Sequence, residues 1–268
     1  MEINQLYCMD NLELMQNLPS KSIDLIYCDI LYGTGKDFGD YKDLPADRDK
    51  IEEFYYPRIK EMQRLLKDTG SIYLQMDYKI NHWIRIILDD VFGYENFRNE
   101  IIWHYDLGGS TQKAFKRKHD NILFYAKTDS AKFEHQKIKP LNKQRYNKVD
   151  KNGRRYFTNG QGYKKYYDTG IRLSDVWTFR GNENMRCLNS MAKERTGYKT
   201  QKPKKLLEII VKSSSNVGDI VADFFLGSGT TVVVAEELDR KWIGCDINQK
   251  AIDITKNRLS GVQKKLFV

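Results

Sequence analysis

The chain has 268 residues, of which 40% are hydrophobic, and a formal net charge of +9 at pH 7. This length allows one large α/β domain, or one domain with a sizeable insertion, and no disulfide or metal is needed to stabilise its core. No apolar run is long enough to span a bilayer, and the first ten residues lack the pattern of a secretory signal, so we expect a cytoplasmic protein without a membrane partner.

Strand-like and helix-like segments alternate along the first half of the chain, which predicts a doubly wound, mostly parallel sheet covered by helices. Apolar runs predict strands at 3–8, 22–28, 70–76, 99–105 and 121–127. Apolar residues at helical spacing predict helices at 11–18, 50–66 and 80–93. The same rhythm returns near the end, with predicted helices at 203–214, 229–238 and 249–259 and predicted strands at 219–225 and 241–247.

Periodicity fades between about Thr128 and Gln201, which indicates an inserted region. The segment from Ser110 to Lys165 holds 16 Lys and Arg against 4 Asp and Glu, and aromatic residues are interleaved with them. Such a block is typical of a surface that binds nucleic acid, and a solvated lysine-rich surface is an equally good reading of the charge alone. The cysteines form no CxxC pair, so we expect reduced thiols and no metal site.

The stretch "DFFLGSGTT", from Asp223 to Thr231, stands where a strand ends and a helix begins. Glycines at such a turn let a ligand approach the backbone, and Asp246 at the end of the next strand is placed to bind ribose hydroxyls. Val232 stands where a dinucleotide fingerprint has its third glycine, and no phosphate-binding loop is present. An adenosine cofactor without phosphates, S-adenosylmethionine, fits this pattern; a simple tight turn is the alternative for the glycines alone.

The same stretch resembles the F-x-G-x-G cofactor motif of the amino-methylating DNA methyltransferases, with Phe225, Gly227 and Gly229 in the motif positions. The tetrapeptide "DILY" resembles the catalytic D-P-P-Y of that family, and its place before the cofactor motif resembles the β group. "TQKP", which contains Lys202, resembles the segment beside the methionine part of the cofactor. Asp10 stands where the family has an acid near the adenine ring.

The resemblance implies a Rossmann-like methyltransferase with a catalytic half (1–127), an inserted target-recognition region (128–199) and a cofactor-binding half (200–268). It implies S-adenosylmethionine as cofactor, double-stranded DNA as partner and N6 of adenine as the methylated atom, because an aspartate at the first position of the tetrapeptide goes mostly with adenine. The implied cofactor-binding residues are Asp10, Asp29, Lys202, Asp223, Phe225, Gly227, Gly229 and Asp246. The implied DNA contacts are Lys116, Arg117, Lys118, Arg154 and Arg155, with Arg172, Arg180 and Arg186 as further candidates for reading guanine.

The chemistry of the proposed reaction assigns roles to Asp29, Ile30 and Tyr32. The amino nitrogen of a base is a poor nucleophile, and hydrogen bonds to the Asp29 carboxylate and the Ile30 carbonyl would localise its lone pair. Tyr32 would supply an aromatic face for a base that has left the duplex. Because Ile30 and Leu31 replace the two prolines of the family, packing must direct the Ile30 carbonyl.

Other readings remain open. Asp29 and Tyr32 could be a turn cap and a core tyrosine, Asp10 a helix N-cap, and Lys202 a solvated residue at a helix start. The rival functions are N4-cytosine methylation, a catalytically degenerate DNA-binding subunit, and methylation of RNA or a small molecule. A homodimer and a cognate restriction endonuclease are further expectations, as is work in a restriction-modification system or as a solitary methylase.

Overall fold

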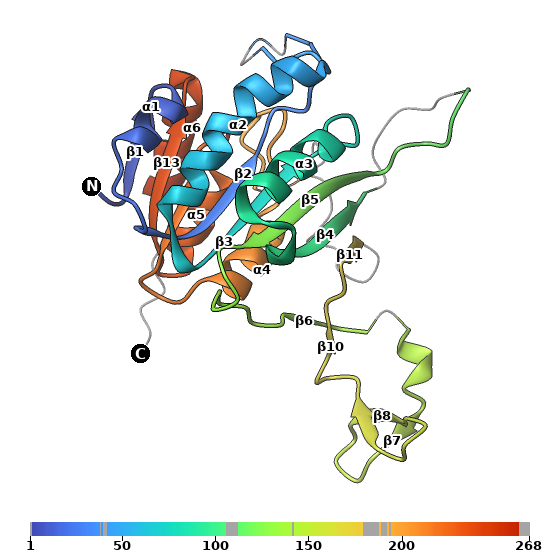
Figure 1. Ribbon diagram of the computed structural model, residues 1–268. Coiled ribbons are helices and arrows are strands. Elements are labelled where there is room, and N and C mark those ends of the chain that lie inside the picture. The colour runs from blue at the N-terminus through green and yellow to red at the C-terminus, as the bar shows by residue number, and fades with distance from the viewer. Residues whose placement is uncertain are drawn as a thin grey trace.

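The structure is a computed structural model that describes residues 2–37, 39, 42–105, 112–140, 142–178, 188, 192 and 194–262 (Figure 1). The helices, in chain order, are α1 (Asn11–Gln16), α2 (Arg48–Leu65), α3 (Asn81–Phe92), η1 (Tyr94–Asn96), η2 (Lys143–Arg145), α4 (Lys204–Ser214), α5 (Thr230–Glu237) and α6 (Gln249–Ser260). The strands are β1 (Gln5–Cys8), β2 (Ile23–Asp29), β3 (Leu66–Met76), β4 (Phe97–His104), β5 (His119–Ala126), β6 (Lys137–Ile138), β7 (Lys148–Val149), β8 (Arg155–Thr158), β9 (Lys164–Tyr166), β10 (Ile171–Arg172), β11 (Val176–Thr178), β12 (Ile220–Asp223) and β13 (Lys241–Asp246). Every strand and helix predicted from periodicity is confirmed, with shifts of a few residues at the ends.

Eight strands form the central sheet in the order β1-β13-β12-β2-β3-β5-β4-β11. All neighbours in it pair in parallel except β5, which runs antiparallel to both β3 and β4. The predicted doubly wound, mostly parallel sheet is therefore confirmed. The reversed direction of β5 has a consequence for function, because it brings the start of β5 to the edge where the parallel strands end.

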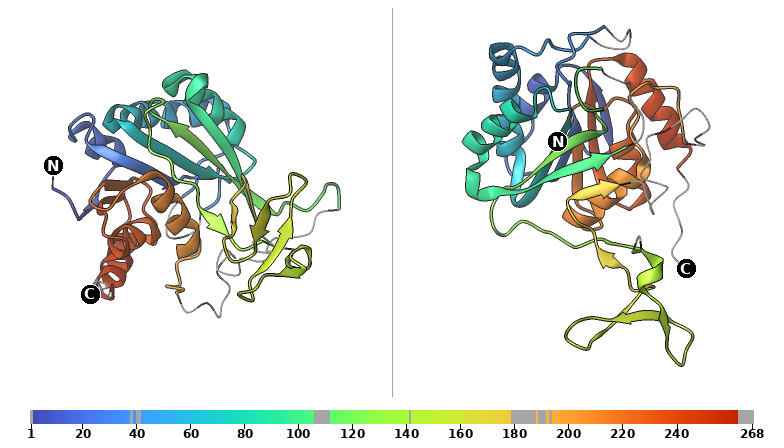
Figure 2. Two further views of the ribbon diagram at one scale, coloured as in Figure 1. Left: turned by 90° about the horizontal axis from the view of Figure 1, so that it is seen from below. Right: turned by 90° about the vertical axis from the view of Figure 1, so that its right-hand side faces the viewer.

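Helices cover both faces of the sheet (Figure 2, left). One core packs beneath α1, α2 and α3, and a second packs beneath α4, α5 and α6. The middle of strand β2, from Leu25 to Cys28, is apolar because both of its faces are buried: Ile26 and Cys28 enter the first core, whereas Leu25 and Tyr27 enter the second. None of the helices within the described ranges has the length and apolar character that crossing a bilayer requires.

The expected inserted region contributes both to the main sheet and to small sheets of its own. β11 pairs with β4 and extends the central sheet, and Trp177 in it packs in the second core with Trp103. β7, β8 and β9 form a three-stranded sheet, and β6 pairs with β10. Figure 1 and the right view of Figure 2 show the β7–β8 sheet at the opposite end of the molecule from the loop that joins β2 to α2.

Candidate active site

A cavity of about 670 Å³ lies at the carboxyl edge of the sheet, where β2 and β12 end. β2 leads to β3 on one side of this point and β12 leads to β13 on the other, and open α/β sheets bind ligands where the strand order diverges in this way. Three aspartates that end strands line the cavity: Asp29, Asp223 and Asp246. The fold thus brings together the acidic strand ends that are far apart in the sequence.

Asp29 forms an ion pair with Lys202, whose Nζ lies 2.6 Å from Oδ2 of the carboxylate. The two side chains are 20% and 11% exposed. Burial raises the pKa of the Asp29 carboxyl above its ordinary value; Lys202 opposes the rise and the charge of Asp120 adds to it. The main-chain carbonyl of Lys202 accepts a hydrogen bond from the Thr230 hydroxyl at 3.2 Å, so this residue links the D-I-L-Y tetrapeptide to the start of α5.

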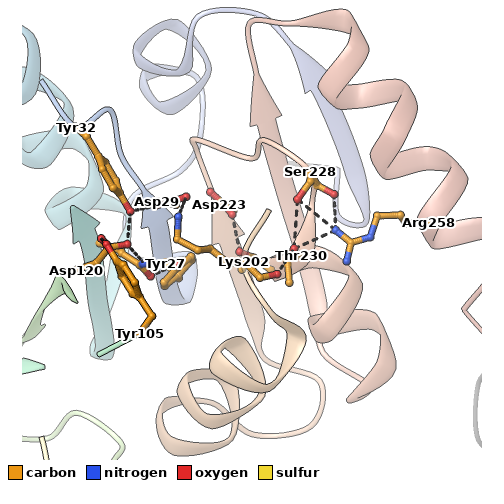
Figure 3. Close-up of polar contacts among 12 residues, drawn as sticks. Tyr27, Asp29, Tyr32, Tyr105, Asp120, Lys202, Asp223, Ser228, Thr230 and Arg258 are labelled. Carbon is orange, nitrogen blue, oxygen red and sulfur yellow. Dashed lines mark hydrogen bonds and ion pairs between the residues drawn. The ribbon is translucent and has the colours of Figure 1, made fainter. Parts of the chain in front are cut away.

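Tyr32 stands between two carboxylates (Figure 3). Its hydroxyl lies 2.8 Å from Oδ1 of Asp29 and 2.8 Å from Oδ2 of Asp120. Asp120 also accepts hydrogen bonds from the Tyr105 hydroxyl at 2.8 Å and from the Gln75 amide at 3.0 Å. Burial raises the pKa of Tyr32 well above its ordinary value, and the charges of Asp120 and Asp29 raise it further, so the phenol stays protonated.

Sequence reasoning did not identify Asp120, Tyr105 or Gln75 as part of the site. The available signal was a carboxylate at the end of the basic stretch "FKRKHD", directly before a buried strand. That signal does not give a location, because Asp120 reaches Tyr32 only through the antiparallel placement of β5.

The turn from β12 to α5 has two glycines in the left-handed region, Gly227 with φ of 52° and Gly229 with φ of 75°. A Cβ on Gly229 would lie 2.3 Å from Oγ1 of Thr255 in α6, so the helix packing also requires glycine there. The main-chain N–H of Gly227 donates to Oδ2 of Asp246 at 2.8 Å. The turn is therefore held close to α6 and tied to the end of β13.

Asp223, which is 2% exposed, stabilises this turn through hydrogen bonds. Its Oδ1 accepts the main-chain N–H of Phe225 at 3.0 Å, and its Oδ2 accepts the hydroxyl of Thr231 at 2.5 Å. Burial raises the pKa of Asp223 to about 7. These contacts make the residue a support for the glycine turn as well as part of the cavity wall.

Asp10 caps α1, and its Oδ1 accepts the main-chain N–H groups of Leu12 at 2.8 Å and Glu13 at 3.3 Å. The other oxygen pairs at 2.8 Å with Arg58, which lies 3.7 Å above the centre of the Phe54 ring. Asp10 and Phe54 both line the cavity. The N-cap reading of Asp10 is confirmed, and the buried Arg58 is a support for the site that the sequence did not reveal.

The backbone around Ile30 is held by packing and hydrogen bonds in place of the family's prolines. Ile30 is 2% exposed, and its main-chain N–H donates to the Gln75 carbonyl at 3.0 Å. The carbonyl of Leu31 accepts the buried Tyr55 hydroxyl at 3.1 Å. Fixing the chain on both sides of the Ile30 carbonyl limits its orientation without a proline ring.

The loop after Tyr32 is closed at its base by Asp43, which is 3% exposed. The Asp43 carboxylate accepts the main-chain N–H groups of Gly33 at 3.1 Å and Thr34 at 2.8 Å. Asp43 and Thr34 line the cavity, so this contact shapes the wall next to the tetrapeptide.

Of the predicted DNA contacts, Lys116, Arg117 and Lys118 lie immediately before β5, on the arm that connects it to β4. They therefore precede the Asp120 end of β5, beside the carboxyl edge of the sheet. The guanidinium of Arg117 lies 4.1 Å above the centre of the Tyr78 ring.

Arg154 and Arg155 belong to the small β7–β8–β9 sheet and its turn, away from the cavity. The Arg154 guanidinium makes two contacts to Asp168, of 2.7 and 3.0 Å, and lies 4.2 Å above the centre of the Tyr166 ring. Arg155 is exposed. The remaining arginine candidates are exposed in β10 (Arg172) or lie outside the described residues (Arg180 and Arg186).

Comparison with known proteins gives one family. The model of the DNA methylase family (N6_N4_Mtase) matches residues 23–257. The chain is 34% identical over 255 residues to the Type II methyltransferase M.HpaI of Haemophilus parainfluenzae, a match that covers 95% of this chain and 74% of that protein. It is 31% identical to the Type II methyltransferase M.BglII of Bacillus subtilis, a match that covers 97% of this chain and 69% of that protein. It is 29% identical to the DNA adenine methyltransferase YhdJ of Escherichia coli K12, a match that covers 93% of this chain and 80% of that protein.

Solved structures share the fold at lower sequence identity. The crystal structure of the M1.HpyAVI–SAM complex superimposes with a TM-score of 0.59 at 22% identity, covering 95% of this chain and 98% of that one. The PvuII DNA methyltransferase, described as cytosine-N4-specific, superimposes with a TM-score of 0.66 at 17% identity, covering 100% of this chain and 89% of that one.

Proposed function

Since the chain belongs to the DNA methylase family and is thus a methyltransferase that uses S-adenosylmethionine, we propose that its target is the N6 amino group of adenine within a specific DNA sequence. The observation that carries the proposal is the meeting of Asp29, Tyr32 and the glycine turn around one cavity. If Asp29 lay away from Phe225 and Gly227, the two sequence motifs could not serve one reaction.

The cavity fits a cofactor that carries an adenosine and a positive charge but no phosphates. Carboxylates line it, together with the rings of Phe54 and Phe225 and with Ile247, an apolar side chain that is 72% exposed. S-adenosylmethionine, when bound, supplies a methyl group on a positively charged sulfur. We expect Asp246 to bind the ribose hydroxyls. Asp10, Phe225 and the glycine turn would contact the rest of the nucleoside, and Lys202 would lie beside the methionine part.

Asp29, Ile30 and Tyr32 would prepare the amino group of the target base. The Asp29 carboxylate accepts one N–H and the Ile30 carbonyl accepts the other, which directs the nitrogen lone pair away from the base ring. After transfer, the nitrogen gives up one of its protons, and we assign the ionised carboxylate of Asp29 as the acceptor of that proton. The ring of Tyr32 replaces part of the stacking that the base loses on leaving the duplex.

Two observations favour adenine over cytosine. Aspartate at the first position of the tetrapeptide goes mostly with adenine in the family that the sequence resembles. The Escherichia coli relative is named a DNA adenine methyltransferase. The cytosine-specific PvuII enzyme shares only 17% identity, so its likeness supports the fold and not the choice of base.

The DNA contacts divide into two groups with different expected roles. Lys116, Arg117 and Lys118 precede the strand that carries Asp120, so we assign them to the phosphates next to the flipped base. Sequence recognition is assigned to the 128–199 region. Within it, Arg155 is exposed, whereas Arg154 would have to exchange its Asp168 contact for a base.

The proposed function also indicates where in the cell the chain works and which partners it has. DNA in a bacterial cell lies in the cytoplasm, and we place the chain there. A homodimer, and a cognate endonuclease that cuts the same sequence, are compatible partners, and a solitary methylase is the alternative.

The direct test incubates the purified chain with DNA and isotopically labelled S-adenosylmethionine and analyses the nucleosides by mass spectrometry. Label in N6-methyladenine supports the proposal, and label only in N4-methylcytosine refutes the choice of adenine. Calorimetry that shows DNA binding without cofactor binding would instead identify a degenerate subunit. Competition by structured RNA would point to an RNA substrate.

A further inference from the structure

The Tyr32 hydroxyl has more acceptors around it than it can serve. Asp29 Oδ1 and Asp120 Oδ2 each lie 2.8 Å from the phenol oxygen. A phenol has one proton to donate, so it donates to one carboxylate at a time. The Asp29 oxygen in this contact is on the carboxylate that the proposed reaction requires as an acceptor for the base.

Asp120 is buried and held in place by two other donors. It is 5% exposed, and it receives hydrogen bonds from Tyr105 on one oxygen and from Gln75 on the other. The amide of Gln75 is oriented by the Tyr27 hydroxyl, which donates to its Oε1 at 2.7 Å and leaves the NH₂ group facing Asp120. Asp120, Gln75 and Tyr27 lie in strands of the sheet and Tyr105 directly follows β4, whereas Tyr32 is in the loop that follows β2.

We propose that Asp120 is a positioning residue that takes the Tyr32 hydroxyl when the target amino group arrives, so that Oδ1 of Asp29 is free to accept the N–H of the base. The inference rests on the proposed amino-methyltransferase function. Tyr32 keeps a hydrogen-bond partner throughout, and its ring stays in place at the cavity wall. Without Asp120, the hydroxyl and the amino group compete for the same carboxylate oxygen.

The test is a double-mutant cycle between Asp120 and the Tyr32 hydroxyl, measured as the single-turnover rate of methyl transfer to a duplex that carries the chain's recognition sequence. That sequence is first identified by sequencing methylated positions in DNA from cells that express the chain. Asp120→Asn keeps a neutral acceptor and is expected to lower the rate about tenfold, because hydrogen bonds to charged groups are stronger than those to neutral groups. Asp120→Ala leaves no acceptor and is expected to lower the rate about 100-fold. In the Tyr32→Phe background, where no hydroxyl competes, the same changes at Asp120 are expected to alter the rate less than about threefold.

A binding measurement gives a second readout that needs no turnover. The duplex affinity is compared between adenine and purine, which lacks the amino group, at the target position. Asp120→Asn is expected to reduce the affinity gained from the amino group about tenfold, and Tyr32→Phe is expected to restore that gain.

The matched control is the surface pair Tyr56 and Asp90, which has the same hydroxyl-to-carboxylate contact of 2.8 Å on α2 and α3. Tyr56→Phe and Asp90→Asn are expected to leave the transfer rate unchanged. Equal losses from the Asp120 changes with and without the Tyr32 hydroxyl would show a purely structural role and overturn the inference while the proposed function stands. A wild-type chain that transfers no methyl group to DNA would overturn both.

Discussion

Replacing Asp29 by alanine tests the central assignment of the site. The change removes the acceptor for the base N–H, and one preorganised hydrogen-bonding group of this kind is worth about 10²–10³ in rate. It also leaves the Lys202 ammonium, 11% exposed, without its counter-charge beside a nitrogen that becomes positive during transfer. The two effects together predict a loss of at least ~10³-fold in the single-turnover rate. Cofactor affinity is expected to change less than about tenfold, because Asp246, Phe225 and the glycine turn are untouched.

The assay follows transfer of a labelled methyl group to DNA at saturating cofactor, with calorimetry for cofactor binding and thermal unfolding as a check of the fold. Asp24→Ala is the matched control, because Asp24 pairs with Lys67 at 2.8 Å near the other end of the same strand. It is expected to lower stability and keep the transfer rate of the folded enzyme. An Asp29→Ala variant that transfers methyl groups within threefold of the wild-type rate would refute the role assigned to Asp29.

Four further predictions use the charges and the backbone of the site. Because the raised pKa of Asp29 must be exceeded for the carboxylate to accept the base, the transfer rate should fall with decreasing pH earlier than for an ordinary aspartate. Asp120→Asn removes a charge that raises this pKa and should move the acid limb of the pH–rate profile to lower pH. Burial raises the pKa of Asp223 to about 7 in the folded chain, against 3.8 for an ordinary aspartate, so the free energy of unfolding should decrease as pH rises from 3.8 toward 7. Chemical denaturation at several pH values should show that the free energy of unfolding depends less on pH in the Asp223→Asn variant. Gly229→Ala combines a positive φ with a Cβ 2.3 Å from the Thr255 hydroxyl, and calorimetry should show a stability loss of about 2–5 kcal/mol and weaker cofactor binding.

Much of the framework could be predicted from local patterns. Residues 25–28 of strand β2 are a continuous apolar run because both faces of the strand are buried there, and α3 ends before Gly93 as its sequence indicates. The glycines at 227 and 229 indicate a turn with positive φ, a conformation that residues with a side chain rarely adopt. Such features depend on residues that are close together in the chain, so the sequence displays them directly.

The order of the motifs also carried information about the site. Acidic residues at the ends of β2, β12 and β13 had to meet at one edge if the strands were parallel, and Asp29, Asp223 and Asp246 do line one cavity. The residues of the small β7–β8–β9 sheet were less predictable. The pairing of Arg154 with Asp168 depends on how short strands align, and neither residue type indicates it.

The sequence by itself determined the alternation of strands and helices, the glycine turn and the acidic strand ends, because each depends on local periodicity or on a backbone conformation that few residues tolerate. Only the tertiary structure decided that Lys202 pairs with Asp29 and that Asp120 faces Tyr32. The first contact joins residues 173 positions apart, and the second joins residues 88 apart. The contact between Asp120 and Tyr32 requires β5 to be antiparallel to β3 and β4. Strand direction is set by the packing of the whole sheet and not by the residues of one strand.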